Sequence, residues 1–166
     1  MSFAFVLPDL GASVIQGWHG PWSHYRVTDR VDMTYAVDFL ADPGTDVLAA
    51  REGTVWGAVD FYDGVYEGLE AETGLRVATN FVVLDHGDSM TLYSHLKKDS
   101  AQFRMGDAVL QGQVIAQTGL SGWVGLTPHL HFAVIKREDT GNRSIRFRFD
   151  EYNSGMPLEH SSFWPS

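Results

Sequence analysis

The sequence predicts an all-β fold, and three observations support that prediction. The 17 glycines and six prolines of this 166-residue chain lie mostly between short apolar runs, where they form turns. The runs alternate between apolar and polar residues or are rich in β-branched and aromatic residues, and none has a convincing helical period. Turn residues recur at spacings of roughly 8 to 12 residues, which favours an antiparallel sheet or sandwich.

Nine segments are expected to form strands, and each is an apolar or alternating run bounded by turn residues. In chain order they are 33–40, 46–50, 53–59, 81–85, 91–96, 108–110, 113–118, 130–136 and 144–149. On this basis residues 1–32 are an N-terminal loop region, 33–136 the core, and 137–166 a C-terminal strand and tail. The length suits a single domain over 1–166.

Two stretches of the sequence have a similar pattern. PGTDVL at 43–48 precedes GTV at 53–55, and MGDAVL at 105–110 precedes GQV at 112–114. Both patterns predict a turn, a short strand, a second turn and a second strand. They indicate a duplicated hairpin unit folded about a pseudo-axis, although such turns are common enough for the likeness to arise by chance.

Composition excludes several classes of function. Twelve Lys and Arg against 21 Asp and Glu give a formal charge of −9, which argues against binding to nucleic acid. The chain has no cysteine, so a metal site would have to use His, Asp or Glu. The N-terminus has no basic region and its apolar run stops at Pro8, so we expect neither a signal peptide nor a transmembrane segment.

The histidine pattern is the main indication of chemistry. His129 and His131 are two residues apart in an expected strand, so both side chains face the same side, as a pair of metal ligands would. An accidental pair on a solvated face is the equal alternative. Asp38 lies in an apolar run and His95 in another expected strand; taken singly, an ion pair or turn hydrogen bond for Asp38 and a core role for His95 explain them better.

Taken together, these segments resemble the lysostaphin and LytM type of zinc metallopeptidase. The resemblance covers most of the chain and is carried by YAVDF at 35–39, PGT at 43–45, REGTV at 51–55, VVLDHGD at 82–88, TLYSHL at 91–96, GDAV at 106–109, GQVI at 112–115, GLSG at 119–122 and PHLHF at 128–132. It implies a LytM-like fold with a duplicated hybrid motif. Several ordered motifs with compatible spacings make it far more specific than His-Leu-His alone.

The resemblance implies roles for individual residues. The family holds zinc through a His-x-x-x-Asp motif and the second histidine of His-x-His, which correspond to position 34, Asp38 and His131. Position 34 is Thr34, a poor zinc ligand. Some relatives carry an upstream Ser-His instead, which 23–24 matches, so His24 is expected as the third ligand, with His19 in reserve.

The family's catalytic pair corresponds to His95 and His129, expected to orient and deprotonate the attacking water and to stabilise the oxyanion. The implied function is a monomeric zinc endopeptidase that cleaves peptide bonds of bacterial peptidoglycan, in the periplasm or outside the cell. Two alternatives stay open. One is a non-catalytic module that binds the cell wall or regulates a hydrolase. The other, based on the hairpin turns, is a biotinyl or lipoyl carrier, although none of the three lysines lies at the required turn.

Overall fold

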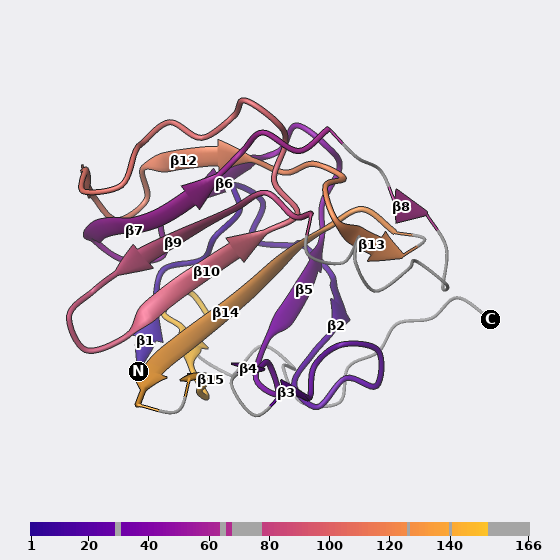
Figure 1. The fold of residues 1–166 in the computed structure, drawn as a ribbon, viewed down its shortest axis with the longest axis horizontal. Coiled ribbons are helices and arrows are strands. Elements are labelled where there is room, and N and C mark those ends of the chain that lie inside the picture. The colour runs from indigo at the N-terminus through magenta and orange to yellow at the C-terminus, as the bar shows by residue number, and fades with distance from the viewer. Residues whose placement is uncertain (29–30, 64–65, 68–77, 126, 140, 153–166) are drawn as a thin grey trace.

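The computed structural model describes residues 1–28, 31–63, 66–67, 78–125, 127–139 and 141–152, and within these ranges it contains strands and no helix (Figure 1). The strands are β1 Ser2–Phe3, β2 Val14–Gln16, β3 Arg26–Thr28, β4 Val31–Asp32, β5 Val37–Leu40, β6 Asp46–Leu48, β7 Gly53–Val59, β8 Tyr66–Glu67, β9 Phe81–Asp85, β10 Met90–Ser94, β11 Ala108–Val109, β12 Val114–Gln117, β13 Trp123–Gly125, β14 His129–Glu138, β15 Gly141–Ser144 and β16 Arg148–Phe149. The all-β prediction is confirmed.

The largest sheet has ten strands and is organised around the long strand β14. Its main path runs β11-β7-β9-β10-β14-β15-β4-β3, and β5 and β2 extend it from the first half of β14. β14 pairs antiparallel with β10 along one edge, and its other edge pairs with β5 through 129–132 and with β15 through 135–138. Figure 1 shows β14 crossing the molecule diagonally beside β10. Strand β14 therefore lies between β5 and β10, and its side chains are neighbours of side chains on both strands.

The two similar stretches of the sequence form reciprocal pairs. β6 of the first stretch pairs with β12 of the second, and β7 of the first pairs with β11 of the second. Each stretch begins with a turn closed by a backbone hydrogen bond, Thr45 N to Asp42 O and Asp107 N to Arg104 O. In both turns the third residue is a glycine with φ of 93°, Gly44 and Gly106, a conformation that L side chains rarely adopt. The structure therefore supports the predicted duplicated unit.

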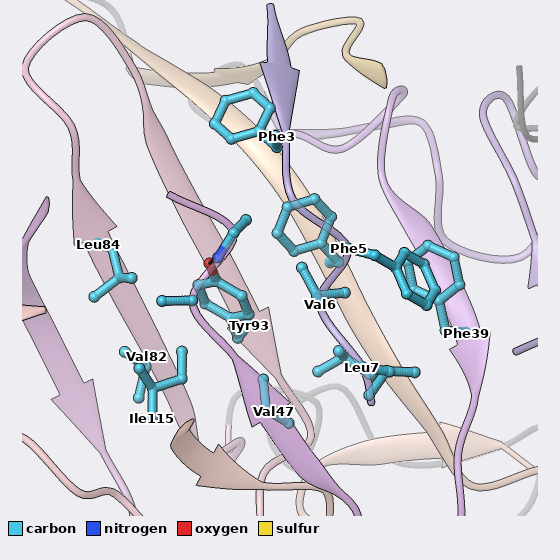
Figure 2. Packing of buried hydrophobic residues seen from close by; sticks show 14 of the residues in the cluster. Phe3, Phe5, Val6, Leu7, Phe39, Val47, Val82, Leu84, Tyr93 and Ile115 are labelled. Carbon is cyan, nitrogen blue, oxygen red and sulfur yellow. Dashed lines mark hydrogen bonds between the residues drawn. The ribbon is translucent and has the colours of Figure 1, made fainter. Parts of the chain in front are cut away.

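The core lies on one face of this sheet and is covered by the N-terminal segment. Residues 3–7 are all buried, and Figure 2 shows Phe3, Phe5, Val6 and Leu7 lying across the sheet beside Phe39. Backbone hydrogen bonds from Ala4 N to Ala50 O and from Leu48 N to Val6 O hold the segment there. Burial of these apolar side chains stabilises the sheet on which the polar site is built.

Several strand boundaries differ from the prediction, and backbone geometry explains the differences. β5 begins at Val37, because residues 33–36 form a turn with Ala36 N bonded to Met33 O. β10 ends at Ser94, because His95 has a φ of 63° and cannot continue an extended strand. Residues 144–149 are not one strand, since β15 ends at 144 and β16 begins at 148. The strands β1–β4, β8 and β13, which are two or three residues long, were not expected from the sequence.

Among the described residues, none belongs to a helix with the length and apolar character needed to cross a membrane.

Candidate metal and catalytic site

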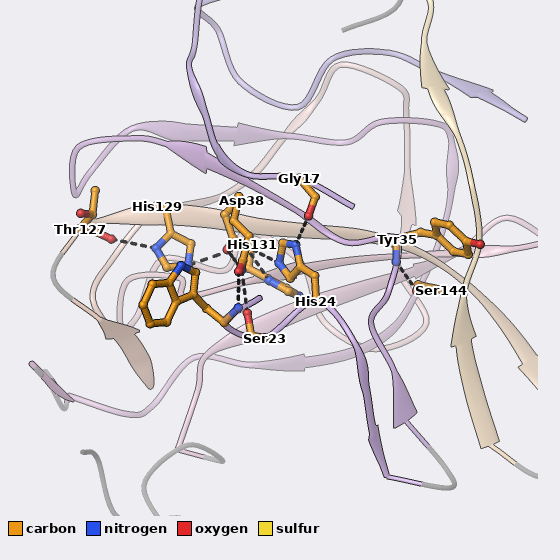
Figure 3. A network of polar contacts seen from close by, with 11 residues as sticks. Gly17, Ser23, His24, Tyr35, Asp38, Thr127, His129, His131 and Ser144 are labelled. Carbon is orange, nitrogen blue, oxygen red and sulfur yellow. Dashed lines mark hydrogen bonds and ion pairs between the residues drawn. The ribbon is translucent and has the colours of Figure 1, made fainter. Parts of the chain in front are cut away.

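One aspartate and four histidines meet where β5, β14 and the end of β10 come together. Asp38 lies on β5, His129 and His131 lie on β14, and His95 directly follows β10. His24 comes from the loop between β2 and β3, which folds back over the strands (Figure 3). All five residues predicted for the site therefore lie together, although they are drawn from four separate parts of the chain.

Strand register explains why three of these side chains converge. His131 lies directly opposite Asp38 on β5 and opposite Ser94 on β10. Directly opposed residues on neighbouring strands project to the same face, and His129 joins them because it is two residues away on β14. Leu130 and Phe132 alternate with the two histidines and are fully buried in the core. The alternation thus places the polar groups on one face and the apolar groups on the other.

His24, Asp38 and His131 form a compact group of potential metal ligands, whose donor atoms all lie within 4.8 Å of one another. His24 Nε2 is 3.2 Å and His131 Nδ1 is 2.8 Å from the same carboxylate oxygen, Asp38 Oδ1. Two imidazole nitrogens and one carboxylate are a typical donor set for a zinc ion that keeps a fourth position for water.

The hydrogen bonding of His24 fits a metal ligand. Its Nδ1–H donates to the carbonyl of Gly17 at 2.8 Å, which leaves Nε2 with a lone pair. Nε2 is buried and, apart from its 3.2 Å contact with the Asp38 carboxylate, has no polar partner. A buried nitrogen without a partner is costly. A cation bound between Nε2 and Asp38 would satisfy it.

His95 and His129 flank this group and are held in the same way. His95 Nδ1–H donates to the carbonyl of Ser121 and His129 Nδ1–H to that of Thr127, both at 2.8 Å. The two rings are 4.7 Å apart between centroids, and His129 Nε2 is 3.8 Å from Asp38 Oδ1. With Nδ1 occupied, each imidazole keeps Nε2 as its proton-accepting atom.

The electrostatics of the site favour a charged carboxylate and shift the pKa values of three of the histidines in different directions. Burial alone would raise the pKa of Asp38, but the charges of His24, His129 and His131 hold it well below its usual value. Burial alone would lower the pKa of His24, but the charge of Asp38 outweighs it and raises that pKa. Burial lowers the pKa of His131 more than Asp38 raises it. The pKa of His95 is lowered to about 3, mainly by burial and then by the charges of His129 and His131.

Thr34 and His19, the alternative positions for the third ligand, lie outside the group of ligands. Thr34 bonds to Asp32 through both its backbone N–H and its hydroxyl, so its hydroxyl does not take part. The reserve ligand, His19, is not among the grouped donors; its ring packs against Tyr35 with centroids 5.3 Å apart. Figure 3 shows Tyr35 pointing away from the histidines, near Ser144.

His86 is held by hydrogen bonds through both of its ring nitrogens. His86 Nδ1 bonds to the carbonyl of Glu52 and Nε2 to the hydroxyl of Thr91, each at 2.8 Å. It therefore links three strand ends away from the site, as expected for a structural residue. His160 lies outside the described residues.

One residue of the site had no role in the sequence interpretation. Gln16, at the end of β2, is 4% exposed and donates from Nε2 to Asp38 Oδ2 at 2.8 Å. An isolated glutamine in a short strand carries no spacing that predicts such a contact. The only available signal was its position just before the loop that contains Ser23 and His24.

Comparison with known proteins agrees with this geometry. Residues 32–143 match the sequence pattern of Peptidase family M23. The matched range includes Asp38, His95, His129 and His131, whereas His24 precedes it. The peptidoglycan DD-endopeptidase ShyC of Vibrio cholerae is 27% identical over 133 residues, which are 80% of this chain and 27% of that protein. The chain spans only 18% to 27% of the length of the curated relatives it matches.

Two solved structures resemble the fold. A zinc-containing peptidase from Vibrio cholerae has a TM-score of 0.56 and 27% identity, covering 81% of this chain and 36% of the other. The catalytic domain of lysostaphin from Staphylococcus simulans has a TM-score of 0.54 and 22% identity, covering 80% and 88%. The lysostaphin-like fold expected from the sequence is confirmed. The family match extends over more than half of the length of this chain, and the chain therefore belongs to Peptidase family M23.

Proposed function

We propose that this chain is a zinc-dependent endopeptidase that cleaves peptide bonds in the stem peptides or cross-bridges of bacterial peptidoglycan. The observation that carries the proposal is the group formed by His24 Nε2, Asp38 Oδ1 and His131 Nδ1, whose atoms lie within 4.8 Å of one another. His95 and His129 stand beside it with proton-accepting nitrogens available. Membership of family M23 supports peptide hydrolysis as the reaction class.

His24, Asp38 and His131 would hold the zinc ion. The proton that His131 Nδ1 shares with Asp38 would have to leave Nδ1, and the neutral imidazole would then carry it on Nε2. Bound there, zinc supplies a Lewis acid that polarises the scissile carbonyl and makes water nucleophilic near neutral pH.

His95 and His129 would manage the proton of the attacking water. Each is fixed by its Nδ1–H bond to a carbonyl, so neither ring has to rotate to present Nε2. The pKa of His95, lowered mainly by burial to about 3, keeps its imidazole neutral near neutral pH, so Nε2 carries no proton. Once protonated, either ring can donate to the oxyanion of the tetrahedral intermediate.

The substrate class and place of action rest on the family and on one relative. ShyC is named for peptidoglycan cleavage, and we extend that substrate to this chain. Trp22 and Tyr25 lie within two residues of His24 in the sequence and are each 45% exposed, so the exposed part of each residue would contact an extended peptide. An enzyme with this substrate acts at the cell wall, in the periplasm or outside the cell.

Zinc content and wall digestion test the proposal. The intact chain is expected to bind about one zinc per molecule by elemental analysis and to clear purified peptidoglycan. His24→Ala is expected to lose both properties. The matched control is His19→Ala, which removes a histidine of the same loop outside the donor group and is expected to retain zinc.

Two outcomes would contradict the proposal. If His24→Ala keeps its zinc, the assignment of the third ligand is wrong. If the intact chain takes up little zinc even when it is supplied, the chain is a non-catalytic module that binds the cell wall through the same fold.

A further inference from the structure

Gln16 contacts both Asp38 and the loop that supplies His24. It is the last residue of β2, and its backbone pairs with that of Asp38 on β5. Its side chain is 4% exposed, so its amide has been removed from water and must be satisfied inside the protein.

The amide makes three hydrogen bonds. Nε2 donates to Asp38 Oδ2 at 2.8 Å and to Ser23 Oγ at 2.9 Å, while Oε1 accepts from the backbone N–H of Trp22 at 3.0 Å. A backbone N–H can only donate and an ionised carboxylate can only accept, so these partners define which end of the amide is nitrogen. Figure 3 shows Ser23, His24 and Asp38 gathered at this point.

The first consequence concerns the two oxygens of Asp38. Gln16 occupies Oδ2, whereas Oδ1 faces His24 Nε2 at 3.2 Å and His131 Nδ1 at 2.8 Å. The carboxylate therefore presents a single oxygen to the histidines. A neutral amide donor does this without adding charge, whereas an acidic side chain in its place would repel the carboxylate.

The second consequence concerns the loop that supplies His24. Trp22 and Ser23, which immediately precede His24, are the two loop residues that Gln16 binds. Gly20 allows this close approach, because a Cβ there would lie 2.2 Å from Cγ and 2.7 Å from Cδ of Gln16. The side chain therefore lies pressed against the loop backbone and joins it to β5.

We propose that Gln16 is the positioning residue of this site: it selects Oδ1 of Asp38 as the ligand atom and holds the loop so that His24 reaches it. The inference rests on the proposed metal site but goes beyond it, since it explains how a histidine from a loop takes the place of one at Thr34. Groups that orient metal ligands typically change metal affinity or activity by about 10- to 100-fold when removed.

Two substitutions separate the contact of Gln16 with Asp38 from its contacts with the loop. Gln16→Glu keeps an oxygen for the Trp22 N–H but replaces the donor to Asp38 with a like charge. Gln16→Met keeps a similar length and removes all three hydrogen bonds of the amide. The matched control is Gln113→Glu, an exposed glutamine whose Oε1 likewise accepts from a backbone N–H, that of Leu110.

The main measurement is zinc affinity by competition with a chromophoric chelator, together with the visible spectrum of the cobalt-substituted protein. Both Gln16 variants are expected to bind zinc about 10- to 100-fold more weakly and to show an altered cobalt spectrum, while Gln113→Glu stays at the intact value. Unchanged affinity and spectrum in both Gln16 variants would overturn the proposal. The proposal would also be overturned if the loss of zinc affinity were fully explained by lower stability of the metal-free protein. Urea unfolding with chelator present measures that stability.

Amide hydrogen exchange at Trp22 gives a readout without metal. Exchange is expected to accelerate in Gln16→Met and to remain slow in Gln16→Glu, which retains the accepting oxygen. Equal protection in the intact chain and Gln16→Met would refute the loop-holding role. Because neither measurement uses peptidoglycan, failure of the proposed hydrolase activity would be distinguishable from failure of this inference.

Discussion

Asn80→Ala tests whether the backbone around His95 depends on a buried amide. Asn80 is 0% exposed; its Nδ2 donates to the carbonyls of Tyr62 at 2.9 Å and Leu96 at 3.1 Å, and its Oδ1 accepts from Tyr62 N at 2.9 Å. His95, just before Leu96, has a φ of 63°, a left-handed conformation that costs a non-glycine residue about 1 to 2 kcal/mol. Surrounding bonds must hold it in place.

The expected loss of stability follows from these bonds. Each side-chain hydrogen bond contributes about 1 kcal/mol net, and three are lost. The carbonyl of Leu96 keeps a donor, because Ser121 Oγ also binds it at 2.8 Å. We therefore expect the free energy of unfolding to fall by about 2 to 3 kcal/mol. In a chain of this size that corresponds to a melting temperature lower by about 4 to 12 °C.

The assay is urea unfolding with chelator present, so that metal binding does not contribute to the measured stability. Asn142→Ala is the matched control, because Asn142 is exposed on β15 and its truncation should change stability by at most about 0.5 kcal/mol. Zinc content of Asn80→Ala should be unchanged, since none of its bonds reaches the donor group, while peptidoglycan turnover should fall. A loss of stability no greater than that of Asn142→Ala would refute the reasoning.

Three other predictions concern the site and its support. His95→Ala and His129→Ala should each keep zinc and lose about 10²- to 10⁴-fold in turnover, because they handle protons; loss of metal in both would contradict the division of roles. The pKa of His24 is raised, so as pH falls through that pKa its protonation competes with metal, and zinc affinity should fall about tenfold per further pH unit. Chelator competition between about pH 5 and about pH 8 measures this, and a flat profile would contradict it. Tyr93→Phe should destabilise the protein by about 1 to 3 kcal/mol in urea unfolding, since the buried N–H of Ala50 loses its acceptor at 2.8 Å; unchanged stability would show that this N–H finds another acceptor.

The sequence was most informative where local periodicity and burial act together. His129 and His131 could be placed on one face because strand alternation is fixed by backbone geometry, and β14 confirms it. The apolar neighbours Leu130 and Phe132 are fully buried, as that alternation requires. Asp38 was noticed as a charge in an apolar run that needs a partner, but only the resemblance to the family implied a role as metal ligand.

Prediction was weaker at strand ends and in the N-terminal segment. His95 was expected inside a strand, but it terminates β10 in a left-handed conformation that hydrophobic pattern does not encode. The two-residue strands β1 and β4 depend on pairing with segments distant in the chain, so a run of residues alone could not indicate them. Local pattern does not contain these long-range pairings.

The sequence by itself predicted the all-β architecture and the duplicated hairpin units, because alternation and turn residues are local properties of the chain, and the resemblance of its motifs to a known family implied the candidate ligands. Only the tertiary structure decided that His24 lies beside Asp38, that the hydroxyl of Thr34 donates to Asp32, and that Gln16 joins the loop to the carboxylate. Those contacts arise when β5 pairs with β14 and β2, which brings together residues up to 95 positions apart, Val37 and Phe132. Geometry of that kind depends on the closure of long loops around a shared core, a physical constraint that no short window of sequence expresses.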